Sequence, residues 1–265
     1  MKNTKIKLNK GEVIIYDFGN IKIHNYDTHD QMNDQVIMLE KNNQIIVIES
    51  PAFYDNITEL ESYLKTLNSK IFGMLLSYHM SGATFLKDNK KYATHSAFEY
   101  GHEGGGKALI DNFTKTFGKS FDNNIHNVTG YINDGSLTIA DINFNIISTS
   151  EAFDIEIPEI NCLYTHMLGS DCHSIIAGVD HANAMLETLE SYLKKDYNLI
   201  LTSHYIPETI NAVNTKISYI KDILNIASTC STKDEMIEKV KKEYSNYSGI
   251  NYLEMTAGFF FPNNE

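Results

Sequence analysis

The feature that most constrains the fold is a strand–helix–strand pattern at residues 44–76. Segments 44–49 and 71–76 are short apolar runs, and the second is continuously apolar, as a buried strand is. Between them, segment 55–67 carries apolar residues at helical spacing. Two strands joined through a helix form a βαβ unit with parallel strands. The pattern therefore predicts an α/β fold built on a partly parallel sheet.

The remaining segments extend this pattern in both directions. Further strands are predicted at 12–16, 21–24, 35–39, 92–94, 136–140, 143–148, 161–165, 173–178 and 198–202. Further helices are predicted at 96–100, 107–117, 182–194, 207–227 and 232–244. The layout predicts one domain over residues 1–265, with two similar halves, about 1–135 and 136–230, and a C-terminal helix and tail at 231–265.

Local motifs refine the helix boundaries and exclude one kind of site. Asn56 and Glu59 have the spacing of a capping box, and so do Thr232 and Glu235. Segment 101–108, GHEGGGKA, nearly matches a phosphate-binding loop. Alanine occupies the last position, where a hydroxyl would hold Mg²⁺, and no buried strand precedes the segment. A flexible loop is predicted there instead.

Composition excludes several classes of partner. The net charge of -12 argues against nucleic acid and against an anionic membrane surface. No apolar run approaches the ~20 residues that span a bilayer, and no signal peptide is recognised. Cys162, Cys172 and Cys230 include no CxxC pair, which predicts reduced thiols in a cytoplasmic protein. The apolar segment 258–262 predicts docking, either onto the chain's own domain or across a homodimer.

Three histidines follow three predicted strands. His79 lies just past strand 71–76, His166 just past 161–165 and His204 just past 198–202. Loops beyond the carboxyl ends of strands are where sites form in α/β sheets. The sequence therefore predicts that these three imidazoles converge at one edge of the sheet.

The arrangement resembles the metallo-β-lactamase superfamily over roughly residues 13–224. Glu49, Ser50 and Pro51 stand where that family usually has an Asp-Thr-Gly strand end. The other motif positions fall on His79, Ser81, Ala83 and Thr84 for H-x-H-x-D-H, then on His166 with Gly169 and Ser170, on Asp180, and on His204. The resemblance implies a four-layer αββα sandwich that holds one or two metal ions at one edge.

The sequence departs from the family in its first motif. Ser81 and Thr84 offer neutral hydroxyls and Ala83 offers no ligand, which argues against two-metal hydrolysis. The remaining ligand positions, His79, His166, Asp180 and His204, suit one zinc or iron ion. The resemblance makes Asp180 either a fourth ligand or the group that orients the attacking water. His181, next to it, is an alternative for that position.

Other polar residues could support the site. His173 follows His166 by seven residues, and the predicted loop 25–34 contains His29, Asp30 and Asp34. For each of them, a hydrogen-bonded or solvated side chain without catalytic function is the competing interpretation.

Three functions are consistent with the sequence. The first is a metal-dependent hydrolase with a mononuclear site, acting on an ester, thioester or amide of a small molecule. The second is a metal-free, non-catalytic binding or regulatory protein of the same fold. The third is redox or oxygen chemistry at an iron ion in the same site.

Overall fold

The computed structural model describes residues 2–262. The chain divides into two compact units, Met1–Met167 with Leu199–Pro207, and Leu168–Asn198 with Glu208–Glu265. The first unit runs past the predicted boundary at about residue 135 and also includes residues 199–207. The single domain stays a prediction. Within the described range, none of the helices is long and apolar enough to cross a bilayer.

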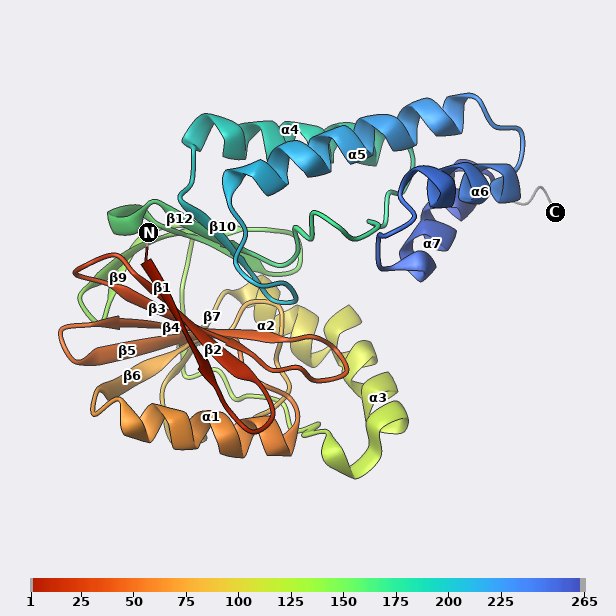
Figure 1. Ribbon diagram of the computed structural model, residues 1–265. Coiled ribbons are helices and arrows are strands. Elements are labelled where there is room, and N and C mark those ends of the chain that lie inside the picture. The colour runs from red at the N-terminus through yellow and green to blue at the C-terminus, as the bar shows by residue number, and fades with distance from the viewer. Residues whose placement is uncertain (1, 263–265) are drawn as a thin grey trace. The chain divides into compact units, whose positions relative to one another are not determined.

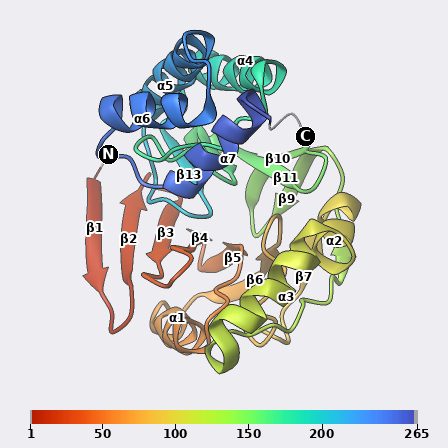
Figure 2. The ribbon, with the colours of Figure 1, turned by 90° about the vertical axis from the view of Figure 1, so that its right-hand side faces the viewer.

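The first unit contains an eight-stranded sheet in which chain order equals spatial order (Figure 2). Its strands are β1 (Lys2–Lys7), β2 (Glu12–Asp17), β3 (Lys22–Asp27), β4 (Gln35–Lys41), β5 (Gln44–Ile48), β6 (Lys70–Leu75), β7 (Lys91–Ala93) and β8 (Gly130–Tyr131). Pairs from β1 to β5 are antiparallel, and those from β5 to β8 are parallel. The predicted βαβ unit is therefore present, as β5, α1 (Tyr54–Thr66) and β6.

The second sheet of the same unit has the order β13-β12-β11-β10-β9. Its strands are β9 (Gly135–Ile139), β10 (Ile142–Ser148), β11 (Phe153–Ile157), β12 (Cys162–Thr165) and β13 (Leu199–Thr202). Only β12 and β13 are parallel among its described pairs. Their carboxyl ends therefore lie side by side, directly before His166 and His204.

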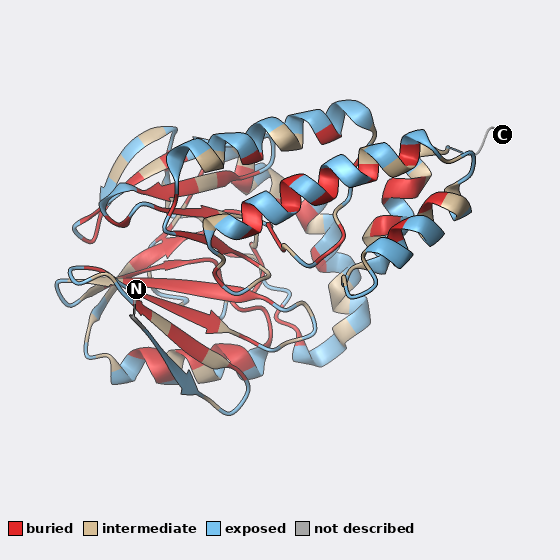
Figure 3. Ribbon diagram, turned by 45° about the horizontal axis from the view of Figure 1, so that its top comes forward, coloured by how far each residue is buried: buried red, intermediate tan, exposed pale blue. Residues whose placement is uncertain are grey.

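One apolar core joins the two sheets. It contains Ile37 and Leu39 from the first sheet together with Phe144 and Ile155 from the second. Helix α1 buries Leu60 in the same core, and it covers the other face of the first sheet (Figure 1). Figure 3 shows that the strands are mostly buried, whereas the helices alternate between buried and exposed residues, as an amphipathic covering layer does.

The remaining helices are divided between the two units. The first unit contains α2 (His95–His102), α3 (Gly105–Phe117) and the short 3₁₀ helices Gly118–Ser120 and Pro158–Ile160. The second contains α4 (Val179–Lys195), α5 (Ile210–Ser228), α6 (Lys233–Glu243) and α7 (Ile250–Phe260). The segment that nearly matches a phosphate loop is divided between α2 and α3, and residues 258–260 of the apolar tail form the end of α7.

The predicted strands omit three of the described ones, β1, β8 and β11, and include a false one. β1, KNTKIK, has too few apolar residues to show strand periodicity, and it pairs on one side only. β11 is not predicted either. Segment 173–178 is not a strand: the N–H of His173 donates to the Ser248 carbonyl and that of Ile176 to the Thr256 hydroxyl. Those bonds replace a strand ladder.

One of the two capping boxes is wrong, and the other is confirmed. The N-cap of α1 is Phe53, without a side-chain cap. Asn56 instead donates to the Tyr26 hydroxyl and the Thr28 carbonyl, so a tertiary contact replaces the local one. At α6, Thr232 accepts from the Glu235 N–H, as predicted.

Glu59 of α1 ties the helix to the turn between β1 and β2. Its carboxylate accepts the N–H groups of Asn9, Lys10 and Gly11 and the Tyr26 hydroxyl. Burial alone would raise the pKa of Glu59, but these donors outweigh it and lower the pKa below its usual value.

We expect Glu59→Ala to lower the free energy of unfolding by about 2 kcal/mol at neutral pH, because several donors lose a charged acceptor. A group with a lowered folded-state pKa stabilises the fold above its unfolded pKa, and that contribution is lost as pH falls through the folded pKa. The difference between wild type and variant should therefore shrink in acid. Urea denaturation across pH measures it, with exposed Thr58→Ala as a control that should change little.

Candidate metal centre

The carboxyl ends of three strands bring the histidines together. His79 follows β6 of the first sheet, whereas His166 and His204 follow the parallel neighbours β12 and β13 of the second. The Ser203 N–H donates to the His166 carbonyl over 3.0 Å, which fixes the two strand ends to each other. The predicted spatial arrangement is therefore present within the first unit.

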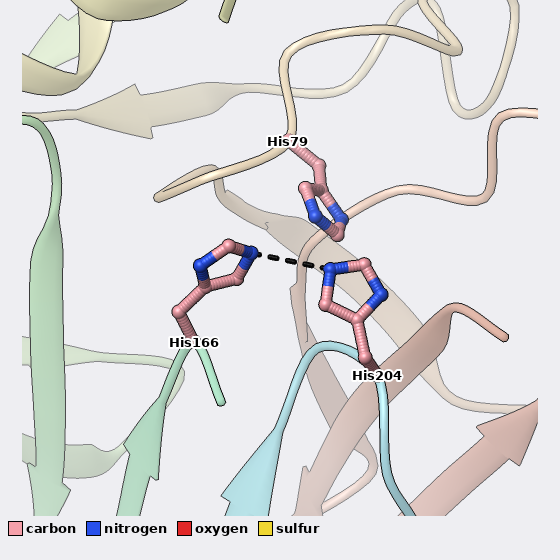
Figure 4. Close-up of side chains that lie close together, drawn as sticks. All are labelled: His79, His166 and His204. Atoms are coloured by element: carbon pink, nitrogen blue, oxygen red, sulfur yellow. Dashed lines mark hydrogen bonds between the residues drawn. The ribbon is translucent and has the colours of Figure 1, made fainter. Parts of the chain in front are cut away.

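The three imidazole rings point toward one another (Figure 4). One ring nitrogen from each of His79, His166 and His204 lies within 4.8 Å of the other two. The Nε2 atoms of His166 and His204 are 3.2 Å apart. Ring centroids are 4.9 Å apart for His79 and His204 and 5.6 Å for His79 and His166. The rings are half-buried.

His204 is oriented from behind. Its Nδ1 lies 3.2 Å from the Met32 carbonyl oxygen and 3.3 Å from the Asp34 carboxylate. Burial alone would lower the pKa of His204, but the adjacent Asp34 carboxylate and the Met32 carbonyl raise it above its usual value. Both neighbours of Nδ1 accept hydrogen bonds, so a proton on Nδ1 leaves Nε2 with a free lone pair toward His166.

His166 is held by an aromatic contact. The Tyr78 ring stacks on it at 4.3 Å between centroids with an interplanar angle of 8°. The Tyr78 hydroxyl donates to Asp154 of β11 over 3.2 Å. Burial, together with the charges of His79 and His204, lowers the pKa of His166 well below its usual value. The ring is therefore neutral at pH 7, which is the form that binds metal.

His79 is placed by a buried carboxylate, Glu49, at the end of β5. Its oxygens accept the N–H groups of Tyr78 over 2.9 Å and His79 over 3.0 Å. Glu49 has no exposed surface, and its φ of 66° lies in the left-handed region, which non-glycine residues rarely adopt. The carboxylate thereby fixes the backbone on which the His79 ring is mounted.

Glu49 also links the two sheets. The Tyr164 hydroxyl of β12 donates to it and lies 2.7 Å from the Ser203 hydroxyl oxygen. Burial, together with the charge of Glu49, raises the pKa of Tyr164 well above its usual value, so Tyr164 stays a neutral donor. The strand ends that carry all three histidines are therefore connected through one buried network.

The His166–His204 pair has the spacing of two ligands of a tetrahedral metal ion. Two nitrogens that each lie ~2.05 Å from a zinc ion at the tetrahedral angle are about 3.3 Å apart. The His166–His204 separation of 3.2 Å corresponds to that spacing. Across the described residues, the buried Nδ1 of His79 lacks a hydrogen-bond partner, as a nitrogen reserved for another kind of contact would. Three imidazoles are a known donor set for catalytic zinc.

Two of the positions where the sequence departs from the family pattern, Ala83 and Thr84, bind a neighbouring segment of the chain instead. The Thr84 hydroxyl donates to buried Asp122 over 2.6 Å, and the Thr84 N–H donates to the same carboxylate. The N–H groups of Gly82 and Ala83 donate to the carbonyls of Asp122 and Asn124. This segment therefore anchors residues 122–124.

The predicted residues of the second unit have other surroundings. Asp180 and His181 lie in the first turn of α4 and are exposed, and His181 Nδ1 accepts the Ala177 N–H over 2.9 Å. His173 is buried, with Nδ1 3.0 Å from the Tyr219 hydroxyl. Burial and the charge of Lys216 lower the pKa of His173 to about 4. The predicted site role of each of these residues stays a prediction.

The loop between β3 and β4 contains the other predicted residues. His29 is exposed, and its Nε2 lies 3.3 Å from Asp27, with Glu12 close by. Asp30 Oδ1 accepts the N–H groups of Met32 and Asp34. Burial and the charge of Asp34 raise the pKa of Asp30 to about 6. Asp30 therefore shapes the loop that presents Met32 and Asp34 to His204.

Sequence reasoning does not assign the roles of Tyr78, Tyr164 and Asp34. Tyr78 stands directly before His79, Tyr164 lies two residues before His166, and Asp34 ends a polar loop. Adjacency to a candidate ligand is the one signal that could identify the tyrosines. The contact from Asp34 joins residues 170 positions apart, which no local pattern encodes.

We expect Glu49→Gln to lower the free energy of unfolding by about 2–3 kcal/mol. A glutamine has one acceptor oxygen for the donors that Glu49 serves, and its amide N–H groups would face other donors. Chemical denaturation measures the change, and Glu99→Gln, an exposed residue on α2, is the matched control. Equal stability of the two variants would contradict the assigned role.

Comparison with known proteins gives a structural result only. The sequence matches no family model and no curated protein. A metallo-β-lactamase family protein from Thermus thermophilus aligns with a TM-score of 0.63 at 11% identity, covering 90% of this chain and 91% of the other. A metallo-β-lactamase from Erythrobacter litoralis aligns with a TM-score of 0.57 at 12% identity, covering 83% of this chain and all of the other.

An enzyme with another activity has a similar fold. The stereoselective inverting sec-alkylsulfatase Pisa1 from Pseudomonas sp. aligns with a TM-score of 0.59 at 14% identity. The alignment covers 94% of this chain but half of that enzyme. The α/β fold predicted from the sequence is confirmed: this chain has the metallo-β-lactamase fold.

Proposed function

We propose that this chain is a metal-dependent hydrolase with a mononuclear site formed by His79, His166 and His204. The observation that supports this most strongly is the 3.2 Å between the Nε2 atoms of His166 and His204, which matches two ligands of one tetrahedral ion. Zinc and iron both accept imidazole ligands. A bound ion of this kind supplies Lewis acidity, which lowers the pKa of water to about 7.

The substrate that we propose is an ester, thioester or amide of a small molecule. The chain contains no arginine, the residue that best recognises phosphate through paired hydrogen bonds. This composition favours a carbonyl compound over an anionic phosphate ester. The net charge of -12 and the three free cysteines support the further proposals of a cytoplasmic location and of no nucleic acid or membrane partner.

We expect protein purified without added metal to contain close to one zinc or iron ion per chain by elemental analysis. His79→Ala and His166→Ala should each lose it, because two imidazoles alone hold such an ion weakly. His95→Ala, which removes an exposed histidine of α2, should keep it. Unchanged metal content in both site variants would refute the assignment.

Asp180 is proposed to complete the site, either as a fourth ligand or by orienting water. We expect Asp180→Ala to retain the metal on the three histidines and to lower kcat by ~100-fold, the usual scale for loss of a group that handles a proton. The Glu187→Ala variant, which changes an exposed residue of the same helix, should hydrolyse substrate at the wild-type rate. Assays on p-nitrophenyl esters, acyl thioesters and anilides measure both, and equal rates would exclude Asp180.

A second candidate function is a metal-free binding protein. Thr84, at a position where the family carries a ligand, is committed to Asp122, which favours a fold that has lost its metal chemistry. Such a protein would be isolated without metal and would bind its small molecule equally well with a chelator present. Stoichiometric metal and activity that is lost on chelation would exclude this candidate.

A further inference from the structure

Asp34 is a buried carboxylate that lies against a candidate ligand. The residue is 1% exposed, and its Oδ1 lies 3.3 Å from Nδ1 of His204. Within the described part of the chain, neither of its carboxylate oxygens has a hydrogen bond that meets the usual geometry. A buried charge without donors is costly, so Asp34 depends on its contact with the His204 ring.

The loop that carries Asp34 is fixed at both ends. Asp30 accepts the N–H groups of Met32 over 2.9 Å and Asp34 over 3.3 Å. The Thr28 hydroxyl and N–H both donate to the Asp34 carbonyl. At the other end, the Gln35 N–H donates to the Ser203 carbonyl over 2.7 Å, one residue before His204. The carboxylate therefore cannot move far from the ring.

Asp34 acts through His204. The group of atoms that could share an ion consists of nitrogens from His79, His166 and His204, and Asp34 is not among them. Two acceptors, the Met32 carbonyl and the Asp34 carboxylate, face Nδ1 of His204. They favour the tautomer with a proton on Nδ1, which leaves the lone pair on Nε2. A carboxylate behind a ligand histidine also raises the basicity of that ligand.

We propose that Asp34 is a positioning residue that fixes the tautomer and ring orientation of His204 for metal binding. The inference rests on the proposed function, because it assigns the carboxylate that supports one of the proposed ligands. The loop between β3 and β4 would then hold Asp34 against His204, and would be more than a solvated connection between two strands.

Asp34→Ala should weaken zinc binding by about 10–100-fold, the usual effect of removing a carboxylate behind a ligand histidine. Asp34→Asn keeps a neutral acceptor at the same place and should bind zinc more tightly than Asp34→Ala. Asp27→Asn is the matched control, because that carboxylate contacts His29 and Gln35 instead. Competition with a chromophoric chelator measures zinc affinity for all of them.

A measurement without metal separates this inference from the proposed function. Nitrogen-15 NMR of the metal-free protein, at a pH where the ring is neutral, should place the His204 proton on Nδ1 in wild type. In Asp34→Ala, where only the Met32 carbonyl still faces Nδ1, the fraction protonated on Nε2 should rise. The same tautomer in both proteins, or zinc affinity of Asp34→Ala within twofold of wild type, would overturn the role of Asp34. If wild type binds no zinc but the NMR difference persists, the proposed hydrolase function is refuted, whereas the effect of Asp34 on the His204 tautomer stands.

Discussion

The structure of the site depends on one buried carboxylate. Glu49 is excluded from solvent, and it accepts hydrogen bonds from the backbone of Tyr78 and His79 and from the Tyr164 hydroxyl. A buried charge is tolerated only when donors surround it, so each donor must be held in place. The donors come from the end of β6 and from β12. Satisfying one charge therefore sets the position of one sheet's edge relative to the other.

The same edge is stiffened around the other two histidines. His166 is stacked on Tyr78, the residue whose N–H is bound to Glu49, so the placement of His79 and His166 is shared. His204 follows β13, which is tied to the His166 carbonyl through Ser203. Groups mounted on strand ends are held more accurately than groups on free loops. Three rings that come from two sheets thus place one nitrogen each within 4.8 Å of the others.

The sequence is sufficient for the framework and the three rings but not for their supports. Apolar runs and the helix at 55–67 predict a parallel pair in the first sheet, and the position of each histidine just past a predicted strand marks it as a candidate. That His79 of one sheet meets His166 and His204 of the other follows from the resemblance to a layered family, not from strand pairing. The contacts of Glu49, Tyr164 and Asp34 join residues from 29 to 170 positions apart. Hydrophobic periodicity carries no information about such pairs. For the same reason, Asn56 has the spacing of a capping residue although its side chain binds the Tyr26 hydroxyl instead.

The donor inventory favours one ion over two. In the family that the sequence resembles, the segment at 81–84 supplies ligands to both metals, but here residues 82–84 donate hydrogen bonds to residues 122–124. The Thr84 hydroxyl is one of several donors to the buried Asp122 carboxylate, and a hydroxyl that binds metal would have to give up that hydrogen bond. Three neutral imidazoles would leave the double charge of a divalent ion uncompensated, which strengthens its Lewis acidity. With an ion bound to the three rings, the Asp34 carboxylate behind His204 would supply negative charge through that ring.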